Sequence, residues 1–185
     1  MAHANAIRPA GARRAARGFT LIEAAIVLAV AMVIAFAVAP TFQEMIDTRR
    51  LVGAADQLAS DLQHVRSAAV ARNQTLRVSF HTSAAFSCYV VHTGGIDDCT
   101  CAATGAAVCN ADVRALKTIA LPAGRIGIAA NVASIAFDPV HGTSTPTGTL
   151  RVTDARGRAI HHVVNIMGRV RSCTPLGAVA GYRAC

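Results

Sequence analysis

The sequence predicts an α+β fold, in which one long N-terminal helix packs on a small antiparallel β domain of two sheets. Three patterns along the 185 residues support this prediction. Residues 19–39 are almost all apolar, residues 40–72 carry apolar side chains at three- and four-residue spacing, and from Asn73 onward apolar and polar residues alternate. The first two patterns are typical of helices, and the alternation is typical of half-buried strands.

Residues 1–18 are polar, small and basic, and we interpret them as a leader that precedes the helix. The formal net charge of the chain is +8, and the leader contributes four of its arginines. Without them the chain carries about +4, with Lys117 as its only lysine. A basic surface favours anionic partners such as nucleic acid or lipid head groups, although a charge of this size also serves solubility alone.

The apolar run of residues 19–39 is long enough to cross a membrane. As a helix it would measure about 31 Å, at about 1.5 Å per residue, and a bilayer core is about 30 Å thick. The basic flank predicts that the leader stays in the cytoplasm and that the rest of the chain is exported. A secretory signal has a shorter apolar core and a small-residue cleavage site after it. We therefore expect this helix to remain as an anchor in the inner membrane.

Residues 40–72 are expected to continue the helix as an amphipathic segment. Pro40 removes a helical hydrogen bond, which predicts a kink or local melting there. The apolar stripe that follows consists of Phe42, Met45, Ile46, Val52, Ala55, Leu58, Leu62, Val65 and Ala69. The opposite face carries Asp47, Arg49, Arg50, Asp61 and Arg72. Such a helix can pack its apolar stripe on a domain.

Residues 73–185 are expected to form a β-rich head. The predicted strands are 75–80, 86–91, 116–121, 125–129, 134–137, 150–153, 160–166 and 169–171. Residues 92–112 are rich in Gly, Thr, Asp and Cys and are expected to form a long loop, and residues 138–148 a turn-rich one. A tight turn is expected at 155–157.

The six cysteines all follow the apolar run, and their number is even. They are Cys88, Cys99, Cys101, Cys109, Cys173 and Cys185. An oxidising compartment would pair them as disulfides, for which six cysteines allow 15 patterns. A zinc site usually shows paired CxxC knuckles, which this spacing does not match. Asp97 and Asp98 lack the other ligands of a calcium loop, so we expect no metal and no cofactor.

The motifs of common enzymes are absent from the sequence. It contains no Gly-rich phosphate loop, no HExxH and no GxSxG. The histidines are scattered, and the adjacent His161 and His162 would point to opposite faces of a strand. We therefore expect no catalytic residues.

The segment MGRVRSC, residues 167–173, suggests an anion-binding site. On a strand, Arg169 and Arg171 would place both guanidinium groups on one face, with Val170 facing the core. Gly168 would let that strand begin tightly. Paired guanidinium groups suit phosphates and therefore DNA binding without base reading. Arginines on an edge strand also serve simply to prevent aggregation. Further positive charge would come from Arg156, Arg158 and Arg183.

The stretch Gly18-Phe19-Thr20-Leu21-Ile22-Glu23, after a basic leader, resembles the class III signal of type IV prepilins and type II secretion pseudopilins. The resemblance implies that a prepilin peptidase cleaves between Gly18 and Phe19 and methylates the new amine. It also offers a partner for Glu23, whose burial in an apolar helix would otherwise be costly. In a fibre of bundled helices, Glu23 would pair with the Phe19 amine of a neighbouring pilin subunit.

The segment Gly168-Arg169-Val170-Arg171 resembles the GRxR motif of FimT-like minor pilins in the GspH/FimT family. The resemblance implies that these residues bind exogenous double-stranded DNA at the pilus during natural transformation. A Cys173–Cys185 disulfide would close a C-terminal loop like that of many pilins.

Two functions therefore remain open. The first is a minor type IV pilin, in or at the tip of a pilus, that is anchored in the inner membrane with its head in the periplasm before assembly and captures DNA. The second is a minor pseudopilin, H-type, of a type II secretion system, with a structural or priming role and no DNA binding.

Overall fold

The computed structural model describes residues 19–102 and 104–185. The chain divides into two units, which meet between Phe42 and Gln43, and helix α1, Leu21–Arg72, contributes to both. The helix continues through Pro40. The local melting expected there is therefore absent, because a proline removes only one backbone donor while the other bonds of the adjoining turns remain.

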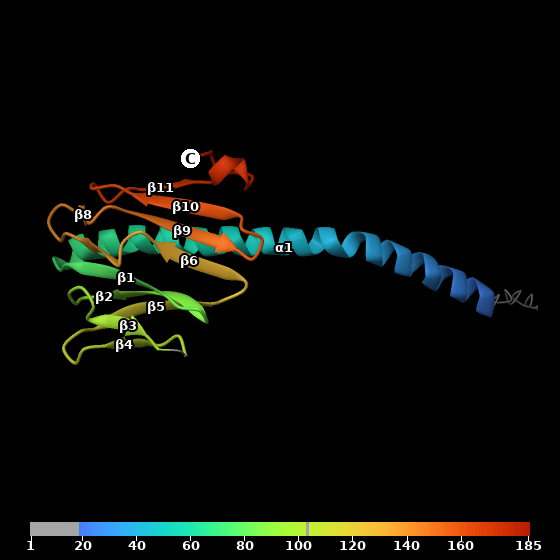
Figure 1. The fold of residues 1–185 in the computed structure, drawn as a ribbon, viewed down its shortest axis with the longest axis horizontal. Coiled ribbons are helices and arrows are strands. Elements are labelled where there is room, and N and C mark those ends of the chain that lie inside the picture. Colours follow the sequence, from blue (N-terminus) through green and yellow to red (C-terminus); the bar gives the residue numbers. More distant parts are fainter. Residues whose placement is uncertain (1–18, 103) are drawn as a thin grey trace, which may run out of the picture. The chain divides into compact units, whose positions relative to one another are not determined.

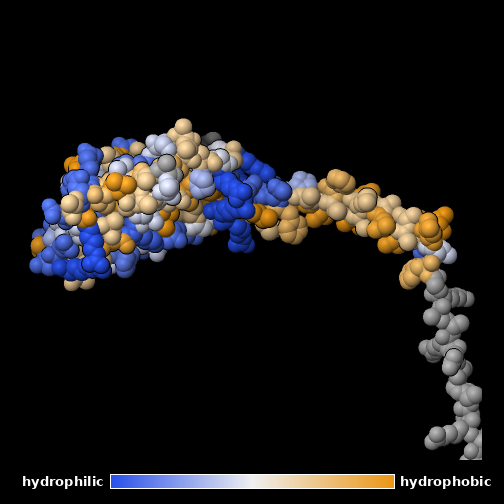
Figure 2. All heavy atoms as spheres, turned by 90° about the horizontal axis from the view of Figure 1, so that it is seen from below, coloured by the Kyte–Doolittle hydropathy of each residue, from blue (hydrophilic) through white to orange (hydrophobic). Residues whose placement is uncertain are grey.

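In the first unit, the described part of the chain buries none of its side chains. Every residue from 19 to 42 is exposed, and Figure 2 shows a nearly continuous apolar surface on this part of α1. An 18-residue window of the helix reaches a mean hydropathy of 2.8, which by length and composition is apolar enough to cross a membrane. An exposed apolar surface of this extent indicates that lipid or other helices cover it.

The second unit contains the remainder of α1 and three antiparallel sheets. One sheet has the order β5-β2-β1-β7-β8, another β11-β10-β9-β6, and a short one pairs β3 with β4. The strands are β1 Leu76–Thr82, β2 Phe86–His92, β3 Cys99–Cys101, β4 Ala107–Cys109, β5 Ala115–Pro122, β6 Ile126–Ala130, β7 Ser134–Phe137, β8 Ser144–Thr145, β9 Gly148–Asp154, β10 Ala159–Val164 and β11 Val170–Cys173. A 3-10 turn, η1 Pro175–Gly177, follows β11. The predicted α+β class is confirmed.

The core lies between α1 and the two larger sheets, and Figure 1 shows the helix running along both of them. The helix buries a stripe with four- and three-residue spacing, consisting of Leu51, Ala55, Leu58, Leu62, Val65 and Ala69. This stripe shares one apolar cluster with residues of both sheets, among them Phe137 and Ile160. Each fully buried Leu or Ile contributes about 1.5–3 kcal/mol, so the stripe accounts for much of the attachment of α1 to the sheets.

A buried polar network reinforces this packing. The Asp61 carboxylate of α1 accepts a hydrogen bond from the Tyr89 hydroxyl at 2.6 Å and pairs with the Lys117 ammonium at 2.7 Å. Burial, together with the neighbouring Asp61, raises the pKa of Tyr89, so that its hydroxyl stays a donor. The only lysine of the chain therefore ties edge strand β5 to the helix.

The segment expected to be a long loop, residues 92–112, instead contains the hairpin of β3 and β4. Two disulfides hold this hairpin, Cys88–Cys101 to strand β2 and Cys99–Cys109 across its own strands. Its three-residue strands are too short to show an alternating pattern, and the covalent links replace most of the packing that a longer strand would need. In the same way, the turn-rich loop of residues 138–148 includes the two-residue strand β8.

Two buried histidines, His92 and His162, form hydrogen bonds within the β head. His92 bonds to the Ser79 hydroxyl at 2.8 Å and accepts the Gly94 amide proton at 3.1 Å. His162 bonds to the Ser172 hydroxyl at 2.9 Å. Burial lowers the pKa of both rings, so both are neutral at pH 7. Their neighbour His161 points to the other face of β10 and is partly exposed, as strand geometry predicts.

Candidate nucleic-acid interface

The turn between β10 and β11, residues 165–169, brings the GRxR segment to the surface. Asn165 closes this turn, because its side-chain oxygen accepts the Arg169 amide proton at 2.9 Å and its carbonyl accepts the Gly168 amide proton at 2.8 Å. Strand β11 begins only at Val170. The expectation that Arg169 lies in this strand is therefore wrong, because these hydrogen bonds hold Arg169 in the turn.

Gly168 is required by its surroundings as well as by its backbone conformation. Its φ is +69°, in the region that favours glycine. A Cβ atom at this position would lie 2.5 Å from the Gly142 carbonyl oxygen and 2.8 Å from Cδ and Nε of Arg66. Glycine here therefore allows a close approach of three segments, rather than only the tight start of a strand.

Arg66 comes from α1 and was not among the predicted site residues. Its Nε donates a hydrogen bond to the Gly142 carbonyl at 2.9 Å, which holds the guanidinium group beside Gly168. The two bonded residues are 76 positions apart in the sequence. In the sequence, Arg66 is simply one polar residue of an amphipathic helix, so only the packing of α1 against the loops could identify it.

These elements line a groove between α1 and β11, which we call the cationic groove. Its volume is about 640 Å³, and its lining residues are Gln63, Arg66, Ser67, Val70, Ala71, Gly168, Arg169, Val170 and Arg171. Three of them are arginines and none is acidic. Arg169 and Arg171 are both exposed. Within the described residues, no ion pair involves Arg66, Arg169 or Arg171.

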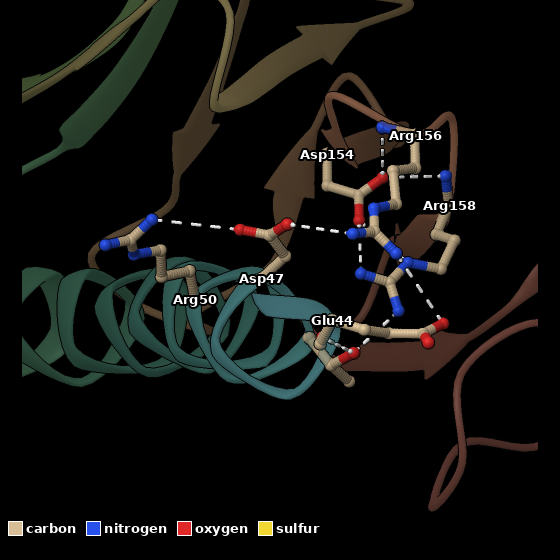
Figure 3. Close-up of polar contacts among 7 residues, drawn as sticks. Glu44, Asp47, Arg50, Asp154, Arg156 and Arg158 are labelled. Atoms are coloured by element: carbon tan, nitrogen blue, oxygen red, sulfur yellow. Dashed lines mark hydrogen bonds and ion pairs between the residues drawn. The ribbon is translucent and has the colours of Figure 1, made fainter. Parts of the chain in front are cut away.

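Arg156 and Arg158 lie in a different setting, which we call the paired cluster: Glu44, Asp47, Asp154, Arg156 and Arg158 (Figure 3). The Arg158 guanidinium lies 2.7 Å from the buried Asp154 carboxylate, and it also donates to the Thr48 hydroxyl at 2.6 Å. Arg156 lies 3.7 Å from both Glu44 and Asp47. Acidic neighbours therefore neutralise both arginines, and neither lines the cationic groove.

The C-terminal loop contains Arg183, the last of the predicted arginines. A Cys173–Cys185 disulfide closes this loop, which is the pairing that the resemblance implied. The Tyr182 hydroxyl donates to Asp56 of α1 at 2.7 Å, and burial, with the help of Asp56, raises the pKa of Tyr182 to about 12. Arg183 is exposed but does not line the cationic groove.

The predicted processing site falls at the edge of the described residues. Gly18 lies outside them, and Phe19 is exposed. Near the start of α1 the Thr20 hydroxyl accepts the Glu23 amide proton at 3.3 Å. The Glu23 side chain is exposed, and no residue that the structure describes forms an ion pair with it.

The cysteines of the described chain are all in disulfides. Across residues 19–102 and 104–185, no group of three or more His, Cys, Asp or Glu side chains is arranged to hold a metal ion.

Comparison with known proteins gives two family matches. Residues 54–168 match the family described as "Type II transport protein GspH", and residues 13–39 match the "Prokaryotic N-terminal methylation motif". The first match ends at Gly168, so Arg169 and Arg171 lie beyond it.

Among solved structures, the chain is similar to the type IV minor pilin FimU of Pseudomonas aeruginosa strain PAO1. The two share 16% sequence identity over 69% of this chain and 94% of FimU, with a TM-score of 0.49. No curated protein matches the chain.

Proposed function

Since the chain belongs to the family of the type II transport protein GspH, we propose that it is a minor type IV pilin that binds extracellular double-stranded DNA through the cationic groove. The N-terminal methylation motif supports the processing step of this proposal. Prepilin peptidase cleaves between Gly18 and Phe19, and the helix then holds the subunit in the inner membrane until it joins a pilus. In the fibre, Glu23 pairs with the Phe19 amine of a neighbour.

The observation that carries the DNA proposal is the gathering of three arginines without acidic partners in one groove. Elsewhere in the head, carboxylates pair with cations, for example Asp61 with Lys117 and Asp154 with Arg158. Positive charge that has no acidic partner in the chain attracts a polyanion. The guanidinium groups of the cationic groove can therefore donate to phosphate oxygens, whereas those of the paired cluster already contact carboxylates of the chain.

Guanidinium groups suit this task because their planar forks donate two hydrogen bonds to one phosphate. Contacts confined to the DNA backbone carry no sequence information, so binding without sequence preference is expected. Each phosphate contact lowers the slope of log affinity against log salt by about 0.9. Three contacts therefore predict an affinity loss on the order of 40-fold between 50 and 200 mM salt.

The proposal can be tested with the full chain in nanodiscs of zwitterionic lipid, which adds no anionic surface. Binding to a fluorescent random-sequence duplex is measured by anisotropy over a range of salt concentrations. Arg169→Gln and Arg171→Gln should each make the salt slope shallower by about 0.9. Arg156→Gln is the matched control, because it removes one positive charge that Glu44 and Asp47 already neutralise.

Two results would contradict the proposal. If Arg156→Gln and Arg169→Gln changed the slope equally, the DNA would not be bound at the cationic groove. If the unaltered chain showed no binding even at low salt, the DNA-binding function itself would be wrong.

A second function is favoured by the description of the family match, which names type II transport. In this alternative the chain is an H-type pseudopilin that primes a secretion fibre and binds no DNA. In the native host, Arg169→Gln/Arg171→Gln would then leave both protein secretion and DNA uptake unchanged, whereas loss of the chain would abolish secretion. If the chain is the DNA-binding pilin, the same double variant reduces transformation.

A further inference from the structure

The turn that carries the GRxR segment also exposes two large apolar side chains. Ile166 is 63% exposed and Met167 is 55% exposed, and both come directly before Gly168. Single exposed apolar residues are common on protein surfaces. Here, however, two adjacent ones lie at the tip of a turn whose next residues line the cationic groove.

A third exposed apolar side chain comes from a neighbouring turn. The Ser144 amide donates to the Ile166 carbonyl at 2.9 Å, and the Ser144 hydroxyl donates to the Asn165 carbonyl at 2.6 Å. These bonds hold the turn of residues 138–143 beside the turn of residues 165–169. Val140, in the first of these turns, is exposed as well. We call Val140, Ile166 and Met167 the apolar tip.

The apolar tip is held in place by hydrogen bonds at its base. The Asp138 carboxylate accepts the amide protons of Val140 and His141, at 2.9 and 2.8 Å. In the other turn, the Asn165 side chain holds the Arg169 amide. These bonds hold the backbone of both turns, so a partner loses little entropy in ordering the backbone there.

The charges around the apolar tip favour an anionic partner. Arg66 and Arg169 lie on the cationic groove beside it. The only carboxylate in the two turns is Asp138, which accepts the amides of its own turn and pairs with the His141 ring at 3.5 Å. An apolar surface bordered by arginines matches a ligand whose charged groups flank a less polar strip.

Duplex DNA has this arrangement, because sugar and base edges line the minor groove between two rows of phosphates. Some proteins insert Ile, Met or similar side chains there and partly unstack a base step. We infer that the apolar tip enters the minor groove of the duplex whose phosphates are bound by the cationic groove. This inference rests on the proposed function, and it adds to it a contact that does not depend on charge.

The test separates apolar from ionic contacts through the salt dependence. The double variant Ile166→Ser/Met167→Ser is compared with the unaltered full chain in the same zwitterionic nanodiscs and with the same duplex. Because no phosphate contact is lost, the line of log affinity against log salt should keep its slope and shift to affinities about tenfold weaker. A duplex with 2-aminopurine at flexible steps should brighten when the unaltered chain unstacks it, and should not brighten with the variant.

The matched control is Ile96→Ser/Val108→Ser. Ile96 is 62% exposed and Val108 is 52% exposed, so the pair resembles Ile166 and Met167 in size and exposure but lies in the region of the β3–β4 hairpin. This control should leave both the affinity and the fluorescence change unaltered. Met167→Phe should bind DNA at least as well as the unaltered chain, because it keeps a large apolar group at the tip.

The outcomes distinguish this inference from the proposed function. Suppose that Arg169→Gln flattens the salt slope, while Ile166→Ser/Met167→Ser has the same affinity at every salt concentration and the same 2-aminopurine fluorescence change as the unaltered chain. The apolar tip then does not contact DNA, and the proposed function stands. If the tip variant instead reduces incorporation into pili without changing DNA binding, the tip contacts a neighbouring subunit and the inference is wrong. If the unaltered chain binds no DNA, both proposals fail.

Discussion

Strand β10 is flanked by two segments with the same arginine spacing, Arg156-Gly157-Arg158 before it and Arg169-Val170-Arg171 after it. In the first segment both arginines face carboxylates, at 2.7 Å for Arg158 and 3.7 Å for Arg156. In the second, both line a groove that contains a third arginine and no acidic residue. Arginine spacing alone therefore does not define an anion-binding site.

Part of the difference comes from α1, which passes both segments. Near the first it presents Glu44 and Asp47, and near the second it presents Arg66. The helix has no acidic residue from position 62 to its end at Arg72. The same helix thus neutralises Arg156 of the first pair, whereas Asp154 of β9 neutralises Arg158, and it adds charge to the second pair.

The largest effect should come from removing Arg158, whose partner Asp154 is buried. Arg158→Met leaves that carboxylate without its cation and should lower the free energy of unfolding by about 4 kcal/mol. Urea unfolding followed by circular dichroism measures this loss. Adding Asp154→Asn should recover part of it, because the side-chain oxygen can still accept the amide protons of Arg156 and Arg158, as the carboxylate does, and carries no charge. A loss below about 1 kcal/mol would mean that the pair is effectively exposed.

The two glycines of these segments offer the next comparison. Gly157 has φ +80° and no atom within 4 Å of the place that a Cβ would occupy, whereas Gly168 has φ +69° and a carbonyl oxygen 2.5 Å from that place. Gly157→Ala should cost about 1 kcal/mol of unfolding free energy, from the backbone conformation alone. Gly168→Ala should cost about 2 kcal/mol more, because the Gly142 and Arg66 contacts must also shift. Equal costs in urea unfolding would show that the close approach at Gly168 is absent.

Arg66 tests whether α1 supplies a third phosphate contact. Arg66→Gln should flatten the salt slope of DNA binding by about 0.9 and lower the free energy of unfolding by about 1 kcal/mol through loss of the bond to Gly142. Arg50→Gln is the control on the same helix, since Arg50 faces Asp47 at 3.7 Å. If both variants gave the same slope, Arg66 would have only a structural role.

The smallest effect on DNA binding should come from removing the acidic partners of Arg156 while keeping Arg156 itself. Glu44→Gln/Asp47→Asn leaves Arg156 without its acidic partners, while Arg158 stays paired with Asp154. The salt slope of DNA binding should steepen by less than about 0.9, because at most one further guanidinium becomes available. A shallower slope would contradict the view that these two carboxylates neutralise Arg156. The exposed ion pairs themselves should change stability by less than about 1 kcal/mol.

Much of the fold could be predicted because local patterns specify it. The spacing of Ala55, Leu58 and Leu62 marks the buried stripe of α1, and the alternation in residues 76–80 marks β1. The expected stripe began too early, because Phe42, Met45 and Ile46 are exposed, and Asp61, expected on the opposite face, is buried. The β3–β4 hairpin could not be predicted, because its strands are short and its shape depends on disulfides to Cys88 and within the hairpin. Any of the possible pairings of these four cysteines was compatible with the sequence.

By itself, the sequence determined that an apolar helix precedes a β head, and it indicated that Arg169 and Arg171 belong to an exposed basic segment. These properties depend on neighbours within a few residues, where periodicity and composition act. Only the tertiary structure decided that Arg66 joins that segment and that Arg156 does not, because carboxylates of the distant helix neutralise Arg156 by proximity in space. Arg66 meets Gly142 across 76 positions, and Thr48 meets Arg158 across 110. Contacts at that separation leave no local pattern in the sequence.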